Sequence, residues 1–73
     1  MRRPPHFGLL LVVYVREAHP SLGLLKGEAG TIVETLDRPY PAYLVEFIDD
    51  DGCTKAEATF TSDQLSATPP PPP

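Results

Sequence analysis

Scarce residue types limit the roles open to this sequence of 73 residues. It has one cysteine, no tryptophan and only six lysines and arginines. Cys53 has no second cysteine to pair with, which fits a reducing compartment or a secreted protein without disulfides, and we expect the cytoplasm as the simpler of the two. A chain of this length forms one small domain, and such a domain is too small for a large, deep catalytic pocket.

Positive charge is scarcest in the part that we expect to fold, residues 7–68. Four lysines and arginines there face all ten aspartates and glutamates, which gives this part a net charge of −6. A surface of this sign repels the phosphate backbone of nucleic acids. We therefore expect the partner to be another protein and not a nucleic acid.

Long apolar runs are also absent. The longest, residues 9–15, is seven residues long and too short to span a bilayer, so we expect no membrane association. It follows Arg2 and Arg3, as the apolar core of a signal peptide would, but Arg16 ends it and no small-residue cleavage site follows. We interpret it as a strand that is buried on both faces.

Alternation of apolar and polar residues between turn formers predicts an all-β fold of five short strands. The predicted strands cover residues 9–15, 29–36, 43–48, 53–60 and 65–67. We expect three glycines to be required by the conformation of the backbone. Gly27 closes the loop before the second strand, Gly30 marks a bulge or a close backbone approach, and Gly52 completes an Asp-Gly hairpin turn.

Seven of the ten prolines lie at the two ends of the sequence. We therefore expect residues 1–6 to be a flexible leader and residues 69–73 to be a disordered polyproline tail, on either side of a barrel formed by residues 7–68. The tail contains the PxxP spacing that aromatic grooves of SH3 and WW domains bind. A tail without a partner is the simpler interpretation, because no arginine lies nearby to orient such a ligand.

The order of the predicted strands, loops and turns is that of a small SH3-like barrel. Three segments, residues 24–34, 43–52 and 63–65, together resemble the small bacterial domain of unknown function 4926. The resemblance implies an SH3-like fold in a family without an assigned reaction, so it bears on architecture and leaves function open.

Two further similarities cover less of the chain. The glycine-threonine strand of residues 30–33, followed by Tyr-x-Val-x-Phe at residues 43–47, is similar to the barrels of nitrile hydratase β subunits. Residues 26–33 resemble the KOW-type loop and strand of ribosomal and transcription-elongation proteins. Basic residues surround that loop in the KOW family and contact RNA, whereas three acidic residues lie around it in this sequence: Glu17, Glu28 and Glu34.

No grouping of acids, bases and nucleophiles predicts catalysis, so we expect no enzyme, no metal and no cofactor. The three adjacent aspartates of residues 49–51 lack the alternate spacing of a calcium loop, and a solvated turn explains them. His6 and His19 are isolated and lack the close spacing of zinc ligands. Cys53 has no histidine nearby to activate it, which indicates an ordinary thiol.

These observations favour a non-enzymatic protein-interaction module, such as an accessory subunit or an antitoxin-like or immunity-like partner. Exposure and residue type predict six partner contacts: Tyr40, Tyr43, Glu46, Asp49, Asp50 and Asp51. The alternative is a KOW-like protein that associates with nucleic acid or ribosomes, which requires Arg16, Lys26 and Arg38 to gather on one face. Self-association through the apolar residues 9–15 is a further alternative that the sequence leaves open.

Overall fold

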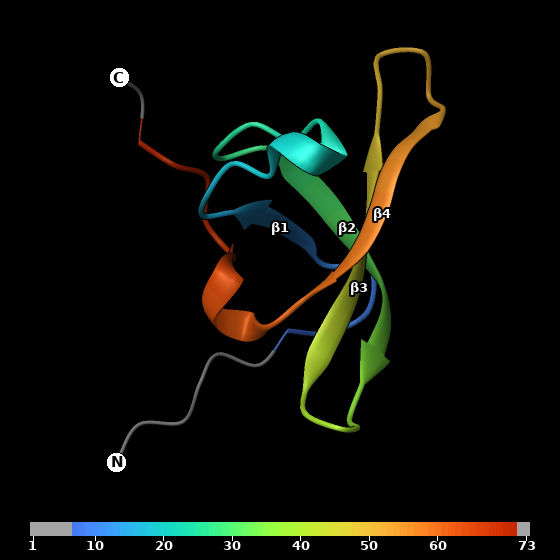
Figure 1. Cartoon of the computed structure of the whole chain (residues 1–73), viewed down its shortest axis with the longest axis vertical. Coiled ribbons are helices and arrows are strands. Elements are labelled where there is room, and N and C mark those ends of the chain that lie inside the picture. Colours follow the sequence, from blue (N-terminus) through green and yellow to red (C-terminus); the bar gives the residue numbers. More distant parts are fainter. Residues whose placement is uncertain (1–6, 72–73) are drawn as a thin grey trace.

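A computed structural model describes residues 7–71 as one antiparallel sheet that is strongly curled into a half-barrel (Figure 1). Its strands are β1 (Val12–Val15), β2 (Ala29–Leu36), β3 (Ala42–Ile48), β4 (Thr54–Phe60) and β5 (Leu65–Ser66). Two single 3₁₀ turns are present, η1 (Pro20–Leu22) and η2 (Ser62–Gln64). The strand order β4-β3-β2-β1-β5 places β1 between β2 and β5. The all-β, SH3-like class predicted from the sequence is confirmed.

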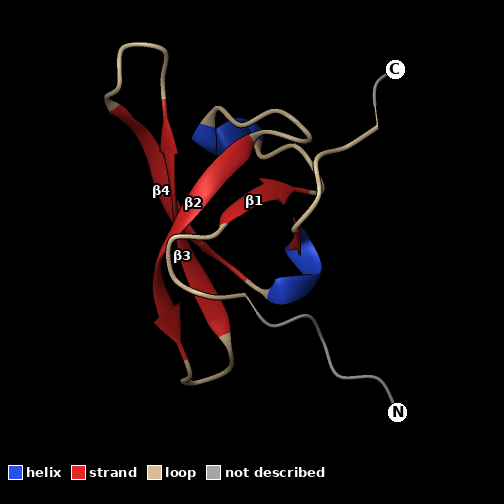
Figure 2. Cartoon of the chain, turned by 180° about the vertical axis from the view of Figure 1, so that it is seen from behind, coloured by secondary structure: helices blue, strands red, loops and turns tan. Residues whose placement is uncertain are grey.

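The hairpin of β3 and β4 projects beyond the rest of the molecule in both views of the chain (Figures 1 and 2). Gly52 adopts φ 83° in its turn, and the Asp49 side chain accepts the Cys53 N–H at 3.0 Å. The predicted Asp-Gly hairpin is therefore confirmed. Its register shifts near the tip, so that Lys55 has no partner residue on β3.

The core lies on the concave side of the curled sheet, where every strand contributes alternate residues. The largest fully buried side chains are Phe47, Leu24, Ile32, Leu65, Val13, Val15 and Val45. The rings of Phe47 and Phe60 pack edge to face with their centroids 5.9 Å apart. Phe7, which precedes all the strands, is also buried and completes this core.

Gly30 lies opposite Val13 in the pairing of β1 with β2 and is buried. A Cβ atom at this position would lie 2.6 Å from Val45 Cγ1 and 2.7 Å from Phe47 Cε1. Only hydrogen fits there, so Gly30 marks a close approach, one of the two outcomes that the sequence predicts. The bulge in β2 lies farther along, between Ile32 and Glu34.

The prediction for residues 9–15 is wrong in length and in burial. Strand β1 begins only at Val12, and its burial alternates, with Val13 and Val15 buried. A half-barrel covers only the concave side of its sheet, so a strand in it cannot be buried on both faces. Leu9 and Leu10 form a turn before β1 instead.

The two ends of the chain are described only in part. The predicted leader, residues 1–6, and the last two residues of the predicted tail lie outside the described residues. Residues 69–71 run past the turn at Gly27, whose φ of 82° confirms the predicted turn. Pro70 packs closely there, because a Cβ atom on Gly27 would lie 2.6 Å from Pro70 Cγ.

Candidate protein-interaction surface

Four consecutive apolar residues at the start of the sheet are exposed, and we call residues 9–12 the apolar segment. Its exposed fractions are 61% for Leu9, 76% for Leu10, 40% for Leu11 and 46% for Val12. On one side the segment is bonded to β2, since the Leu10 N–H donates to the Ile32 carbonyl at 2.7 Å. On its other side β5 pairs only with residues 14 and 15, so within residues 7–71 no strand covers it.

Leu10 is the one residue other than glycine that has a positive φ in the described part of the chain. Its φ is 63°, in the left-handed region that glycine and asparagine adopt with least strain. Packing in the core does not offset this backbone strain, because Leu10 is 76% exposed. A strained and exposed leucine is a feature that folding alone does not require.

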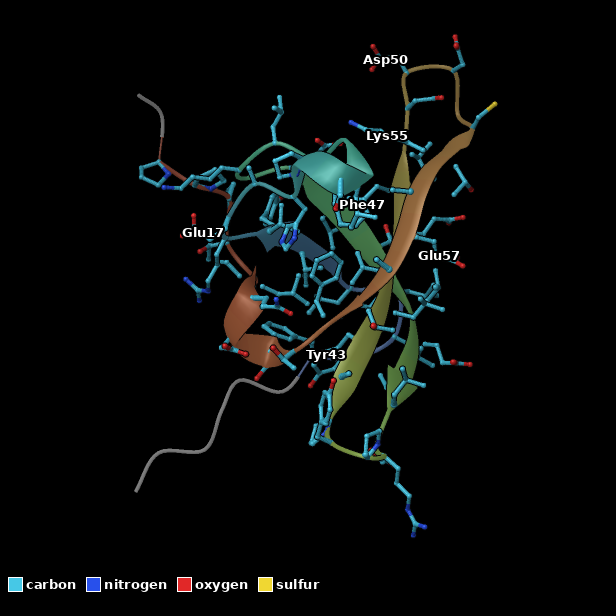
Figure 3. All side chains as sticks on the ribbon, in the orientation of Figure 1. Glu17, Tyr43, Phe47, Asp50, Lys55 and Glu57 are labelled. Atoms are coloured by element: carbon cyan, nitrogen blue, oxygen red, sulfur yellow. The ribbon has the colours of Figure 1, made fainter. Side chains whose placement is uncertain are left out.

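The convex side of β1 to β4, which we call the outer face, carries the second part of the surface. Register places Val12, Thr31, Glu46 and Glu57 side by side across the four strands. Glu46 and Glu57 are direct neighbours, and like charges in that position repel each other. Glu57 points away from the body of the molecule (Figure 3). The outer face is therefore both apolar and acidic.

The nearest lysine is engaged elsewhere. Lys55 points toward the body of the molecule, on the opposite side from Glu57 (Figure 3), and its Nζ lies 2.6 Å from Glu28 Oε2. Glu28 also accepts the Leu25 N–H at 3.0 Å. The bond from Lys55, followed by that from Leu25, lowers the pKa of Glu28. This is the one salt bridge within residues 7–71, so the glutamates of the outer face have no such partner there.

A hollow of about 190 Å³ lies in the outer face between β1, β2 and β3. Its lining combines apolar residues, one hydroxyl and one carboxylate: Val12, Ala29, Gly30, Thr31, Glu46 and Ile48. Glu46 is half-buried, and its Oε2 accepts the Thr54 hydroxyl at 2.7 Å. The hollow joins the apolar segment through Val12, which belongs to both.

The structure separates most of the predicted contact residues. Tyr40 is 57% exposed in the turn between β2 and β3, whereas Asp49, Asp50 and Asp51 lie at the tip of the other hairpin, at the opposite end of β3 (Figure 1). Glu46 lies between these two ends, on the outer face. Of the predicted contacts, only Glu46 belongs to the hollow.

Tyr43 is not the exposed contact that we predicted. It is 4% exposed, and its hydroxyl accepts the Phe7 N–H at 3.3 Å. The two rings meet edge to face with centroids 5.4 Å apart. Alternation along β3 places Tyr43 on the concave side with Val45 and Phe47, so it packs in the core.

The sequence interpretation treated residues 9–15 as a strand buried on both faces and named them as a surface only for self-association, although the sequence contains a signal for exposure. A strand with one covered face needs an apolar residue only at every second position. Seven consecutive apolar residues exceed that need. The excess apolar residues could have been assigned to the surface.

The basic residues that the RNA hypothesis requires are divided between two places. Arg16 and Lys26 line one groove of about 410 Å³ beside the described part of the tail. The Arg16 Nε donates to the Leu65 carbonyl at 3.0 Å, so this guanidinium also holds β5. Arg38 lies in the turn between β2 and β3, at the far end of β2. The three therefore do not share one face.

His19 and Cys53, which the sequence singled out for possible chemistry, lie in different parts of the described chain. No group of three or more His, Cys, Asp and Glu side chains within residues 7–71 is placed to hold a metal ion. His19 packs edge to face on Phe60 with centroids 5.1 Å apart, and Cys53 is exposed. In this same part of the chain, no helix has the length and apolar character that crossing a membrane requires.

Comparison with known proteins gives a family without a stated activity. Neither the curated proteins nor the solved structures include a match to this chain. A family model described as a domain of unknown function (DUF4926) matches residues 9–67, which include all five strands and the apolar segment. The chain therefore belongs to the DUF4926 family.

Proposed function

We propose that this protein is a non-enzymatic interaction module that binds another protein through the apolar segment. The observation that carries the proposal is Leu10, whose side chain is 76% exposed on a left-handed backbone. Glycine or asparagine would relieve the backbone strain there, and the core does not use the leucine. Contact with a partner supplies a reason for this residue that folding lacks.

Two features of the surroundings support the proposal. The apolar segment is contiguous, and contiguous exposed apolar residues are typical of interaction sites, whereas scattered ones are ordinary. The folded part is acidic, with a net charge of −6 over residues 7–68, which favours a basic partner. An accessory subunit and an antitoxin-like or immunity-like protein are both roles that operate by such binding.

Affinity capture from the source lysate tests this proposal, with asparagine substitutions as the readout. Asparagine tolerates the left-handed backbone, so Leu10→Asn should fold. Leu25→Asn is the matched control, because Leu25 is 73% exposed and lies outside the apolar segment. We expect a stoichiometric protein partner that the unmodified chain and Leu25→Asn retain and that Leu10→Asn loses.

Nuclease treatment of the lysate separates this proposal from the nucleic-acid alternative. A partner that survives nuclease and depends on Leu10 supports the interaction module. Loss of every partner on nuclease treatment would favour the KOW-like alternative, as would binding that Arg16→Gln and Lys26→Gln abolish. Equal capture by Leu10→Asn and Leu25→Asn would contradict the role of the apolar segment.

A further inference from the structure

The hollow in the outer face has the composition of a site for one long cationic side chain. Val12 and Ile48 supply apolar walls, and Glu46 supplies a carboxylate at one side. Lysine and arginine combine an apolar stem with a charged end, so that their stems cover apolar surface while the charge reaches a polar group. Neither a purely apolar side chain nor an acidic one would satisfy both parts of this lining.

A hydrogen bond within the chain orients the Glu46 carboxylate for contact with a cation. The Thr54 hydroxyl donates to its Oε2 at 2.7 Å and so fixes the orientation of the carboxylate. Its other oxygen, Oε1, accepts no hydrogen bond within residues 7–71 and is open to solvent. An N–H donor from a cation can replace water there, and hydrogen bonds between charged groups are stronger than those between neutral ones.

Glu57 adds a reason for the cation to come from outside the chain. It lies directly opposite Glu46, and the two negative charges repel each other. Lys55, the closest lysine in sequence, points to the other side of the hairpin and is paired with Glu28 (Figure 3). Neither Glu46 nor Glu57 forms a salt bridge within residues 7–71. A positive charge from the partner, placed at the hollow, would therefore reduce the repulsion between them.

We propose that the hollow between β1, β2 and β3 binds a lysine or arginine side chain of the partner protein, with its cation on Glu46 and its stem between Val12 and Ile48. This inference rests on the proposed function and adds to it the chemistry of the partner. The partner contacts the apolar segment with apolar side chains and inserts one basic residue beside it. Val12 borders both contacts, so one continuous segment of the partner can make them.

Titration of the isotope-labelled chain followed by NMR tests the hollow without the partner. The probes are Nα-acetyl-lysine amide, Nα-acetyl-arginine amide and, as a neutral control, Nα-acetyl-norleucine amide. We expect a cationic probe to shift the amide signals of Val12, Thr31 and Ile48 saturably. Glu46→Gln should weaken that binding about tenfold, because it removes a charge-assisted hydrogen bond. Glu34→Gln, an acid of β2 outside the hollow, is the matched control and should bind as the unmodified chain does.

Three outcomes would overturn the inference. The norleucine probe could bind as well as the lysine probe, Glu46→Gln and Glu34→Gln could weaken binding equally, or the shifts could concentrate at the aspartates of the hairpin tip. Each would show that the hollow does not select a cation. Partner capture then separates the two proposals. A partner lost from Leu10→Asn but retained by Glu46→Gln would leave the interaction module standing and remove the cation site.

Discussion

The two halves of the apolar run at residues 9–15 have similar composition and opposite surroundings. Val13 and Val15 are at most 1% exposed, whereas the three leucines before them are 40% to 76% exposed. The second half is paired on both sides, with β2 and with β5. The first half has β2 on one side only and begins in a turn. Burial in this small sheet therefore depends on how many strands surround a residue as well as on its hydrophobicity.

Asparagine substitutions at Val13 and at Leu10 should differ most in their effect on stability. Val13→Asn places an amide in the core, where it loses apolar contacts and leaves polar atoms without partners, at a cost of about 2–5 kcal/mol. Leu10→Asn should leave the free energy of unfolding unchanged or slightly higher, because asparagine accepts the left-handed backbone. Urea unfolding of both variants measures the difference. Equal destabilisation would show that Leu10 belongs to the core.

Alanine substitutions at two glycines should show the same difference at the backbone. Gly30 lies opposite Val13, and Gly30→Ala forces a methyl group against Val45 and Phe47, which should cost about 1–3 kcal/mol. Gly8, next to the exposed half, has open space where its Cβ would lie, so Gly8→Ala should change stability little. Thermal unfolding compares the two. A Gly30→Ala variant as stable as Gly8→Ala would mean that the sheet spreads easily at this point.

The smallest effect concerns the turn that holds the buried half in place. Val15 exchanges backbone hydrogen bonds with this turn, at 2.8 Å to the Gly27 N–H and 3.1 Å to the Glu28 carbonyl, and Glu28 is itself tied to Lys55 on β4. Glu28→Gln should cost about 0.2–1 kcal/mol at neutral pH, because the pair is partly exposed. Glu34→Gln, outside any such pair in residues 7–71, should cost less.

The pH dependence of this effect follows from the lowered pKa of Glu28. Because the folded-state pKa lies below that of the unfolded chain, the stabilisation is complete above the unfolded value of about 4.3. It is lost as pH falls through the lower folded-state pKa. The stability difference between the unmodified chain and Glu28→Gln should therefore shrink in strong acid. A difference that stays constant with pH would show that the ion pair is not its source.

Local patterns were enough to predict much of this fold. The bounds of β2 and the Asp-Gly hairpin agree with the sequence interpretation, because Gly52 and the β-branched residues of β2 act over short distances. The excess of apolar residues at 9–15 indicates that some of them lie at the surface, but local patterns could not predict which ones, because that depends on the two-residue length of β5. Alternation along β3 was enough to place Tyr43 in the core with Val45 and Phe47, but the contact of its hydroxyl with Phe7, which lies 36 residues earlier, could not be predicted locally.

The register shift at Lys55, which leaves this residue without a partner on β3, has a consequence for aggregation. Strand β4 ends the sheet, and an edge strand of seven residues offers its backbone to any extended chain that approaches. The register shift beside Lys55 interrupts that edge with a bulge and a charged side chain, two devices by which natural sheets discourage the addition of foreign strands. The sheet thus exposes leucines of the apolar segment beside β1, whereas its opposite edge, β4, disfavours the addition of further strands and so fibril-like growth.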